Sequence, residues 1–316
     1  MKAWAFGFAV ILGCAAAAAQ TAAKPPGNPP AAQQIAPTIV KNVINVPLVF
    51  LALDKHHRFY SGLRQSQIRV FDNNQPQKIQ RFVAEGNLPL RIVLLIDISN
   101  SINSRWGFEQ RAATDFLQSV LVRGRDKAMV VGFDTSLHIE QTYTDNFRDL
   151  ADAIEGMRPS GGTALYDAVF ESAHNDFGGL ATGGEHRNVI VIISDGADDQ
   201  SRYSCDEAIA MAQNTGAVIY TIGTEPTGVD PNSDDVMRRF ANQTGGRSYF
   251  PPQASDLQNA FRSIVNDLRH QYVVAYSPNN FVPNGTFHAV RIQILVKGVT
   301  VRTRTGYFAQ PAGSEP

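Results

Sequence analysis

Three short segments of the sequence place carboxylate and hydroxyl side chains where they could bind a metal ion. Asp97-Ile98-Ser99-Asn100-Ser101 supplies three such side chains at alternate positions, a threonine follows Gly161-Gly162, and an aspartate lies in Ser194-Asp195-Gly196. Oxygen ligands without a neighbouring His or Cys favour a hard cation, Mg²⁺ or alternatively Mn²⁺ or Ca²⁺, over zinc or copper. The predicted ligands are Asp97, Ser99, Ser101, Thr163 and Asp195.

The low charge of this ligand set indicates what the metal would do. Only two of the five predicted ligands are carboxylates, so the metal would keep much of its positive charge and leave a position for an external anionic oxygen. Such a site favours ligand capture over permanent structural sequestration. An isolated Asp-x-Ser-x-Ser segment is also a common helix N-cap, so the metal assignment depends on the three loops converging.

Buried parallel strands are the elements that must bring these loops together. Continuous apolar runs at 91–96, 128–133, 189–194 and 217–222 are typical of strands covered on both faces. Amphipathic stretches at 108–121, 147–157, 164–177, 206–214, 233–243 and 254–268 predict helices, and Gly178, Gly216 and Gly245 stand at plausible helix ends. This alternation predicts a doubly wound, mostly parallel α/β sheet, in which ligands bind beyond the carboxyl ends of the strands.

Short β-strands are predicted on both sides of this α/β region. The apolar segments up to residue 53 and at 68–71 and 79–83 precede it, and 272–276, 288–296 and 300–308 follow it. We expect both groups to form one accessory β-sandwich, because neither could bury a core alone; the alternative is a separate flap at each end. The expected division is an N-terminal β region at 38–88, the α/β domain at 89–269, a C-terminal β region at 270–310 and a tail at 311–316.

The first residues predict export from the cytoplasm. Lys2, the apolar run 3–12 and the small residues 15–19 match a signal peptide over 1–19, and a Pro/Ala-rich linker follows over 20–37. Ile11-Leu12-Gly13-Cys14 resembles a lipobox, so a lipid anchor at Cys14 stays open. We expect the protein in the periplasm, in the cell envelope or secreted. Cys205 would then be a single cysteine, which we predict to be inert.

Composition narrows the classes of partner. The net charge is −1, and the sequence contains no Lys/Arg-rich run and no zinc-finger spacing. We therefore expect no binding to nucleic acid, and attachment to a membrane only through Cys14.

The metal-binding pattern resembles that of the von Willebrand factor A and integrin I-domain family. Its metal-ion-dependent adhesion site combines Asp-x-Ser-x-Ser with a Thr and an Asp on two further loops, and all five positions are filled here without substitution. The resemblance implies direct contacts from the hydroxyls, contacts often through water from the Asp pair, and a carboxylate of the ligand on the metal. Tyr276-Ser277-Pro278 and Gly306-Tyr307-Phe308 are similar to the bacterial exported VWFA-related proteins of the acidobacterial type. His56-His57 departs from them, because they often have Gly in this turn.

These features together predict a binding protein that is not an enzyme. The expected function is adhesion-type capture of a carboxylate on a protein or glycan partner. One alternative is an envelope scaffold in which the metal is structural. A second is a metal-assisted hydrolase, against which the motif loops offer no convincing His or Glu general base and no Gly-x-Ser-x-Gly elbow.

Overall fold

A computed structural model of the chain describes residues 45–84, 88–102, 106–177, 186–224, 229–279 and 281–309. The predicted signal peptide, the linker, Cys14, residues 38–44, Gly178 and the tail lie outside the described residues. Residues Val43–Pro316 form one compact unit. Within the described ranges, none of the helices combines the length and the apolar character that crossing a bilayer requires.

A six-stranded sheet lies at the centre of the α/β part. Its strands are β5 (Leu90–Asp97), β6 (Lys127–Phe133), β7 (Leu137–Thr144), β8 (Arg187–Ser194), β9 (Val218–Gly223) and β10 (Ser248–Tyr249). The strand order is β10-β9-β8-β5-β6-β7, and all neighbours are parallel except β6 and β7. Every residue of β8 is buried, as an apolar run between two layers of helices must be.

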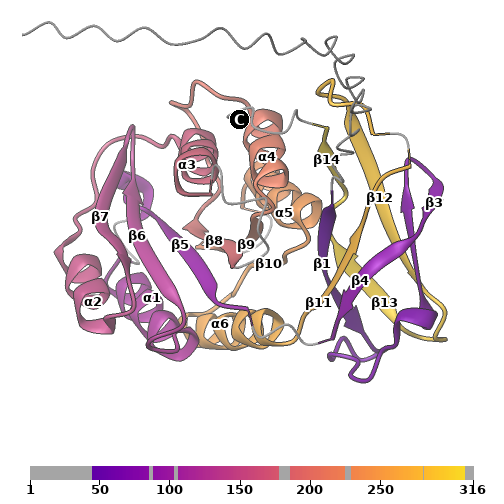
Figure 1. The fold of residues 1–316 in the computed structure, drawn as a ribbon. Helices are drawn as coiled ribbons and strands as arrows, with labels where there is room; N and C mark the ends of the chain where they lie inside the picture. Colours follow the sequence, from indigo (N-terminus) through magenta and orange to yellow (C-terminus); the bar gives the residue numbers. More distant parts are fainter. Residues whose placement is uncertain are drawn as a thin grey trace, which may run out of the picture. The chain divides into compact units, whose positions relative to one another are not determined.

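Helices cover both faces of this sheet (Figure 1). Those that enclose a core on one face are α1 (Trp106–Val120), α2 (Phe147–Gly156) and α6 (Ala254–Arg269). Those that enclose a second core on the other face are α3 (Leu165–Glu171), α4 (Cys205–Asn214) and α5 (Pro231–Thr244). The predicted doubly wound α/β sheet is confirmed.

Strands from both ends of the chain form two small antiparallel sheets. The strands are β1 (Val46–Leu53), β2 (Ile68–Asp72), β3 (Gln75–Gln77), β4 (Ile79–Val83), β11 (Tyr272–Tyr276), β12 (Phe287–Ile294), β13 (Thr300–Thr303) and β14 (Gly306–Phe308). Their orders are β13-β1-β11-β4 and β14-β12-β2-β3. N-terminal and C-terminal strands alternate in the first sheet, and a C-terminal pair joins an N-terminal pair in the second. A third apolar core lies between these sheets. The shared sandwich is therefore confirmed, and the alternative of two separate flaps is wrong.

The single strand expected over 300–308 is wrong. It divides into β13 and β14, which belong to different sheets. At the break, Arg304 donates from Nη1 to the Gln213 carbonyl (2.8 Å) and from Nη2 to the Pro47 carbonyl (3.0 Å). The Thr305 backbone N–H also leaves the strand ladder, because it donates to the Gln243 carbonyl (3.0 Å). The local apolar pattern gives no sign of these contacts with distant segments.

Two further local features differ from the prediction. The helix expected over 164–177 is α-helical only to Glu171 and continues as a π-helical turn over Ser172–Asp176. The antiparallel edge strand β7 was not predicted, because most of its side chains are polar and none is fully buried. Gly216 and Gly245 do stand at helix ends with positive φ of 68° and 90°, as predicted.

Candidate metal centre

The paired strands β5 and β8 bring the first and third predicted loops together at their carboxyl ends. Asp97 is the last residue of β5, and its side chain is fully buried. Its Oδ1 accepts a hydrogen bond from the Ser99 backbone N–H (2.8 Å), and its Oδ2 accepts one from the Ser194 hydroxyl (2.7 Å). The Asp97 carboxylate is therefore held in one orientation from both loops.

Three of the predicted ligand side chains are in direct contact beside Asp97. The hydroxyl oxygens of Ser99 and Ser101 are 2.9 Å apart, and the Ser101 hydroxyl donates to Asp195 Oδ2 (2.7 Å). The other carboxylate oxygen of Asp195 accepts from the Ala197 N–H (3.0 Å). Oxygens from two loops that are distant in sequence thus converge, which separates this motif from a simple helix cap.

Backbone hydrogen bonds attach the loop of Thr163 to the same edge of the sheet. The Ser160 N–H donates to the Ile98 carbonyl (2.6 Å), and the Asn100 N–H donates to the Gly161 carbonyl (3.3 Å). Thr163 is buried, and its N–H donates to Asp199 Oδ1 (2.8 Å). The structure therefore attaches the backbone of the Thr163 loop to the first loop and to Asp199, at the same edge of the sheet.

Asp134 and Gly196 help to hold the three predicted metal-binding loops in place. Asp134, which follows β6, accepts from the Ser160 hydroxyl (3.1 Å) and contacts His138 Nε2 (3.0 Å). Burial raises the pKa of Asp134, but hydrogen bonds from His138 and other donors outweigh it and lower that pKa overall. Gly196 has a positive φ of 86°, and a Cβ there would lie 2.7 Å from the Ser233 carbonyl oxygen. Only glycine fits this turn next to Asp195.

The chemistry of this cluster fits a hard divalent cation. Burial outweighs the hydrogen bonds from Ser194 and Ser99 and raises the pKa of Asp97 to about 6, with a smaller contribution from the charge of Asp195. A nearby cation would favour the charged form of both carboxylates. Among the described residues, no three His, Cys, Asp or Glu side chains gather to hold a metal by themselves. Metal binding here would therefore depend on the serine and threonine hydroxyls.

The sequence did not reveal the residues that support the predicted ligands. Ser194 bonds to Asp97, Ser160 bonds to Asp134, and Asp199 bonds to the backbone of Thr163. The one local signal was Ser194, a hydroxyl directly after the apolar run 189–193 of its strand. The other roles follow from contacts between loops.

The family model of the von Willebrand factor type A domain matches residues 92–263, which is more than half of the chain. The chain belongs to this family. The curated UPF0353 protein of Mycolicibacterium paratuberculosis is 26% identical to it over 206 residues, or 58% of this chain. The matched part spans 62% of the length of that relative.

Several solved structures are similar to the A domain at low sequence identity. BatB from Bacteroides thetaiotaomicron is 16% identical with a TM-score of 0.46, covering 57% of this chain and 97% of its own. The vWF domain of the type V pili tip protein Mfa5 from Porphyromonas gingivalis is 15% identical with a TM-score of 0.48, covering 59% and 96%. The mussel byssus protein PTMP1 with a zinc-occupied MIDAS motif is 17% identical with a TM-score of 0.49, covering 62% and 49%.

Proposed function

We propose that this protein is an adhesion-type binding protein that captures a carboxylate on a protein or glycan partner. A divalent cation, Mg²⁺ or else Mn²⁺ or Ca²⁺, would be held by Asp97, Ser99, Ser101, Thr163 and Asp195. The observation that carries the proposal is the contact of Ser99, Ser101 and Asp195 beside the buried Asp97. Membership in the A-domain family supports it. When bound, the cation supplies a Lewis-acidic position for the ligand oxygen.

The predicted ligands would have two different roles in binding the cation. Asp97 contributes a buried charge whose orientation is fixed by Ser194 and by the backbone of Ser99. The serine and threonine hydroxyls contribute oxygens without charge, so the site stays attractive to an anionic ligand. The proposed function is therefore binding, with the five side chains acting as ligands of the cation.

Metal titration tests the first part of the proposal. We expect calorimetry with MgCl₂ or MnCl₂ to detect one ion per chain, and Asp195→Ala to weaken its binding by about a hundredfold or more. Asp152→Ala removes an exposed carboxylate from α2 and is the matched control, which should bind as the wild type does. If both variants bind the ion with wild-type affinity, the assigned site is wrong.

Ligand capture is tested with arrays of peptides that contain Asp or Glu. We expect binding that EDTA abolishes, that Mg²⁺ restores, and that is lost when the acidic residue is replaced by Asn or Gln. Asp97→Ala should abolish this binding and leave the fold intact. If the wild type captures no peptide and Asp97→Ala unfolds, the result favours a structural metal. If the wild type hydrolyses generic esters in a metal-dependent reaction, the result favours an enzyme.

We infer further that the protein acts outside the cytoplasm, as the features of residues 1–19 suggest. Fractionation of cells that express the full chain tests this, and mass spectrometry of the mature N-terminus distinguishes the two routes. A chain that begins at Gln20 indicates simple cleavage, whereas a lipidated Cys14 indicates an anchor. An intact Met1 in the cytoplasmic fraction would contradict export.

A further inference from the structure

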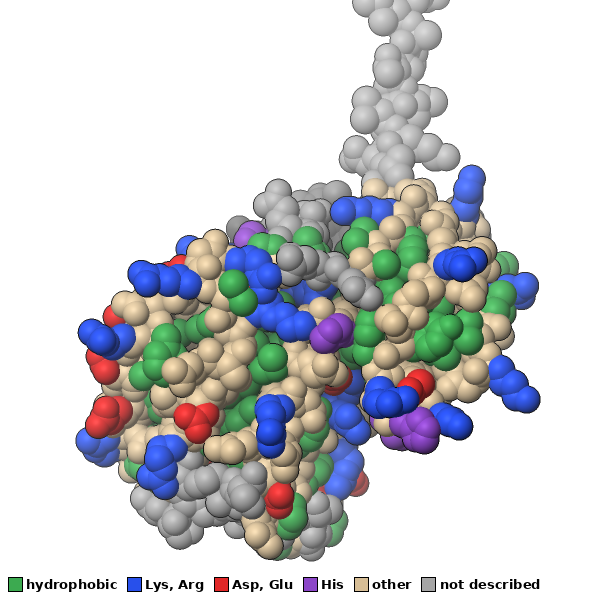
Figure 2. All heavy atoms as spheres, turned by 90° about the horizontal axis from the view of Figure 1, so that it is seen from below, with side chains coloured by type: hydrophobic (Ala, Val, Ile, Leu, Met, Phe, Trp, Pro, Cys, Tyr) green, Lys and Arg blue, Asp and Glu red, His purple; other side chains and the backbone are tan. Residues whose placement is uncertain are grey.

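The small net charge of the chain conceals two parts of opposite charge. The sandwich segments 45–83 and 270–309 contain ten Lys or Arg and two Asp or Glu, whereas the α/β segment 89–269 contains 15 and 25. The expectation that the protein attaches to a membrane only through Cys14 assumed an even distribution of charge. Figure 2 shows Lys and Arg side chains around the sandwich at the right and most of the visible acidic side chains on the α/β part.

The two acidic residues of the sandwich offset little of this charge at the surface, because one pairs with a single arginine and the other is buried. Asp54 is bonded to Arg58 within one turn (3.0 Å). Asp72 is buried between the sheets, where it accepts hydrogen bonds from two tyrosine hydroxyls and contacts His288 Nδ1 (2.7 Å). The other exposed cations described in the sandwich, apart from Lys55, are Arg64, Arg69, Lys78, Arg81, Arg291 and Lys297.

The outer face of β12 and β2 combines cations with apolar side chains. Alternation along β12 exposes Phe287 and Arg291, and Leu295 is exposed directly after the strand. The two apolar residues are 43% and 49% exposed. Arg291 lies opposite Phe71 of β2, and its guanidinium carbon is 4.0 Å from the centre of that ring. The stacking holds the Arg291 guanidinium against the sheet, where its outer side can meet an anion.

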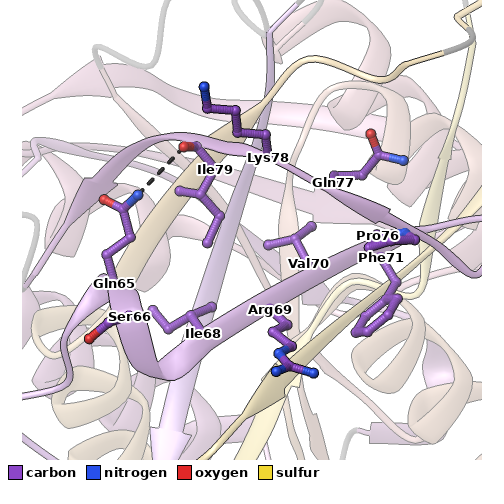
Figure 3. A pocket seen from close by; sticks show the side chains of 10 residues that line it. All are labelled: Gln65, Ser66, Ile68, Arg69, Val70, Phe71, Pro76, Gln77, Lys78 and Ile79. Atoms are coloured by element: carbon purple, nitrogen blue, oxygen red, sulfur yellow. Dashed lines mark hydrogen bonds between the residues drawn. The ribbon is translucent and has the colours of Figure 1, made fainter.

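A groove lies at the edge of the same sheet, next to the outer face of β2. It has a volume of about 800 Å³ and lies beside β2, β3 and the start of β4 (Figure 3). Its lining includes the apolar side chains of Ile68, Val70 and Ile79 together with Arg69 and Lys78, and it contains no acidic residue. Ile68 and Val70 are only 5% and 1% exposed and belong to the core between the sheets, so what the groove contributes at the surface is the cations Arg69 and Lys78.

We propose that this face of the sandwich docks on the surface of a bilayer that contains anionic lipids. The negative surface potential of such a bilayer attracts Lys and Arg, and exposed aromatic and aliphatic side chains enter the boundary between headgroups and acyl chains. A soluble polyanion would use the cations but would leave Phe287 and Leu295 in water. The proposal goes beyond ligand capture, and it does not depend on the metal centre.

A second copy of this chain fits the surface less well. Its α/β part carries the opposite charge, but among the described residues of that part the exposed large apolar side chains lie on separate elements. Val122 follows α1, Ile139 is in β7, and Val229 precedes α5. They form no apolar patch that could cover the one on the sandwich.

Vesicle sedimentation tests the proposal directly. The protein is the chain from Gln20 onward, which lacks the apolar leader and Cys14 but keeps the whole compact unit of Val43–Pro316. EDTA is present, so that metal-dependent capture does not contribute. We expect binding to phosphatidylcholine vesicles that contain phosphatidylglycerol, no binding to phosphatidylcholine alone, and a decrease in binding as NaCl is raised.

Charge-reversed variants locate the surface. We expect Arg69→Glu/Arg291→Glu to lower partitioning into anionic vesicles by about tenfold or more. Arg111→Glu/Arg148→Glu makes the same change of net charge at exposed positions of the α/β part and should bind as the wild type does. Because Arg291 stacks on Phe71, Lys78→Glu/Lys297→Glu provides a second variant at exposed positions outside the strands, and it should also weaken binding.

Four other results would contradict docking on a membrane. Equal binding to both kinds of vesicle, or wild-type binding by both sandwich variants, overturns the proposal. Phe287→Ser/Leu295→Ser should weaken binding although every cation is kept. If it does not, and soluble polyphosphate displaces the protein, the face is a polyanion site and not a membrane site. Salt-sensitive dimerisation lost in the sandwich variants, without vesicle binding, would assign the face to a second copy.

Discussion

Ser194 places a hydroxyl at the end of the apolar run 189–193 of β8, in contact with the predicted metal ligand Asp97. Its Oγ donates to Asp97 Oδ2 (2.7 Å) and accepts from the Gly196 N–H (2.9 Å). We predict that Ser194→Ala keeps the fold and weakens Mg²⁺ binding by about tenfold or more, because the Asp97 carboxylate loses the donor that orients it. Calorimetric titration measures this. Ser119→Ala, which removes a hydroxyl bonded within α1, should change nothing.

Asp176 gives the stability of the protein a dependence on pH. Burial raises the pKa of its carboxyl to about 6, against the opposing charge of Arg91. The folded protein therefore keeps a proton that the unfolded chain loses, so this residue lowers the free energy of unfolding as pH rises from about 4 to about 6. We predict that Asp176→Asn is more stable than the wild type by roughly 1–2 kcal/mol at pH 7, allowing for solvent screening.

Thermal unfolding between pH 4 and pH 7 measures this effect of Asp176. The difference in Tm between Asp176→Asn and the wild type should be near zero at pH 4 and should reach its full value above pH 6.5. A difference that is the same at every pH would show that the Asp176 carboxyl does not titrate in this range.

The predicted ligands and their supporting residues differ in how far the sequence reveals them. Asp97, Ser99 and Ser101 form a local pattern, and the buried strands before Asp97 and Asp195 indicate that two of the loops meet. The support that Ser194, Ser160 and Asp199 give depends on side-chain contacts between loops, and no local pattern encodes such contacts.

At the scale of elements, the end of α5 packs closely on β9. A Cβ on Gly246 would lie 1.9 Å from the Ile219 carbonyl oxygen, which belongs to the backbone and cannot move aside. We predict that Gly246→Ala lowers the free energy of unfolding by about 2–3 kcal/mol or prevents folding. The matched control is Gly156→Ala at the end of α2, where a Cβ meets nothing within 4 Å. Chemical denaturation should show a change within about 1 kcal/mol for this variant, and equal losses for both would contradict the packing argument.

The elements that the sequence predicted well are those whose apolar residues follow a simple pattern along the chain. The strands of the parallel sheet are continuous apolar runs, and the helices have one apolar face. Strand β7 lies at an edge with mostly polar side chains, and β13 and β14 separate where Arg304 bonds to distant carbonyls. In these places the tertiary environment, and not the local pattern, determines the structure.

At the scale of the whole molecule, Arg304 links the sandwich to the α/β domain. Its guanidinium bonds the carbonyls of Gln213 in α4 and of Pro47 in β1, and Arg302 bonds Asp267 of α6 (2.5 Å). We predict that the two parts unfold in one calorimetric transition, with equal calorimetric and van't Hoff enthalpies. Arg304→Met should lower the free energy of unfolding by about 2–3 kcal/mol, because it removes both hydrogen bonds through which the side chain joins the two parts.

The control for Arg304→Met is Arg111→Met, an exposed arginine on α1 that should leave Tm within about 2 °C of the wild type. Two well-separated transitions in the wild type would show that the parts are independent. The sequence did predict that the two β regions share a core, since each is too small alone. It could not predict which side chains join them to the α/β domain.

The pairing of β4 with β11 determines the order in which the chain can be completed. Val83 and Val273 lie opposite each other, so the entire α/β domain occupies the place of a hairpin loop. Closing so long a loop has a large entropic cost while the α/β domain is unfolded. This entropic cost falls once the domain is compact and its two ends are adjacent. During synthesis, β1, β2 and β4 are therefore made before their partner strands β11 and β12, and they stay unpaired with them until those strands leave the ribosome. The sandwich, although its first strands are made early, is the part of the protein that is finished last.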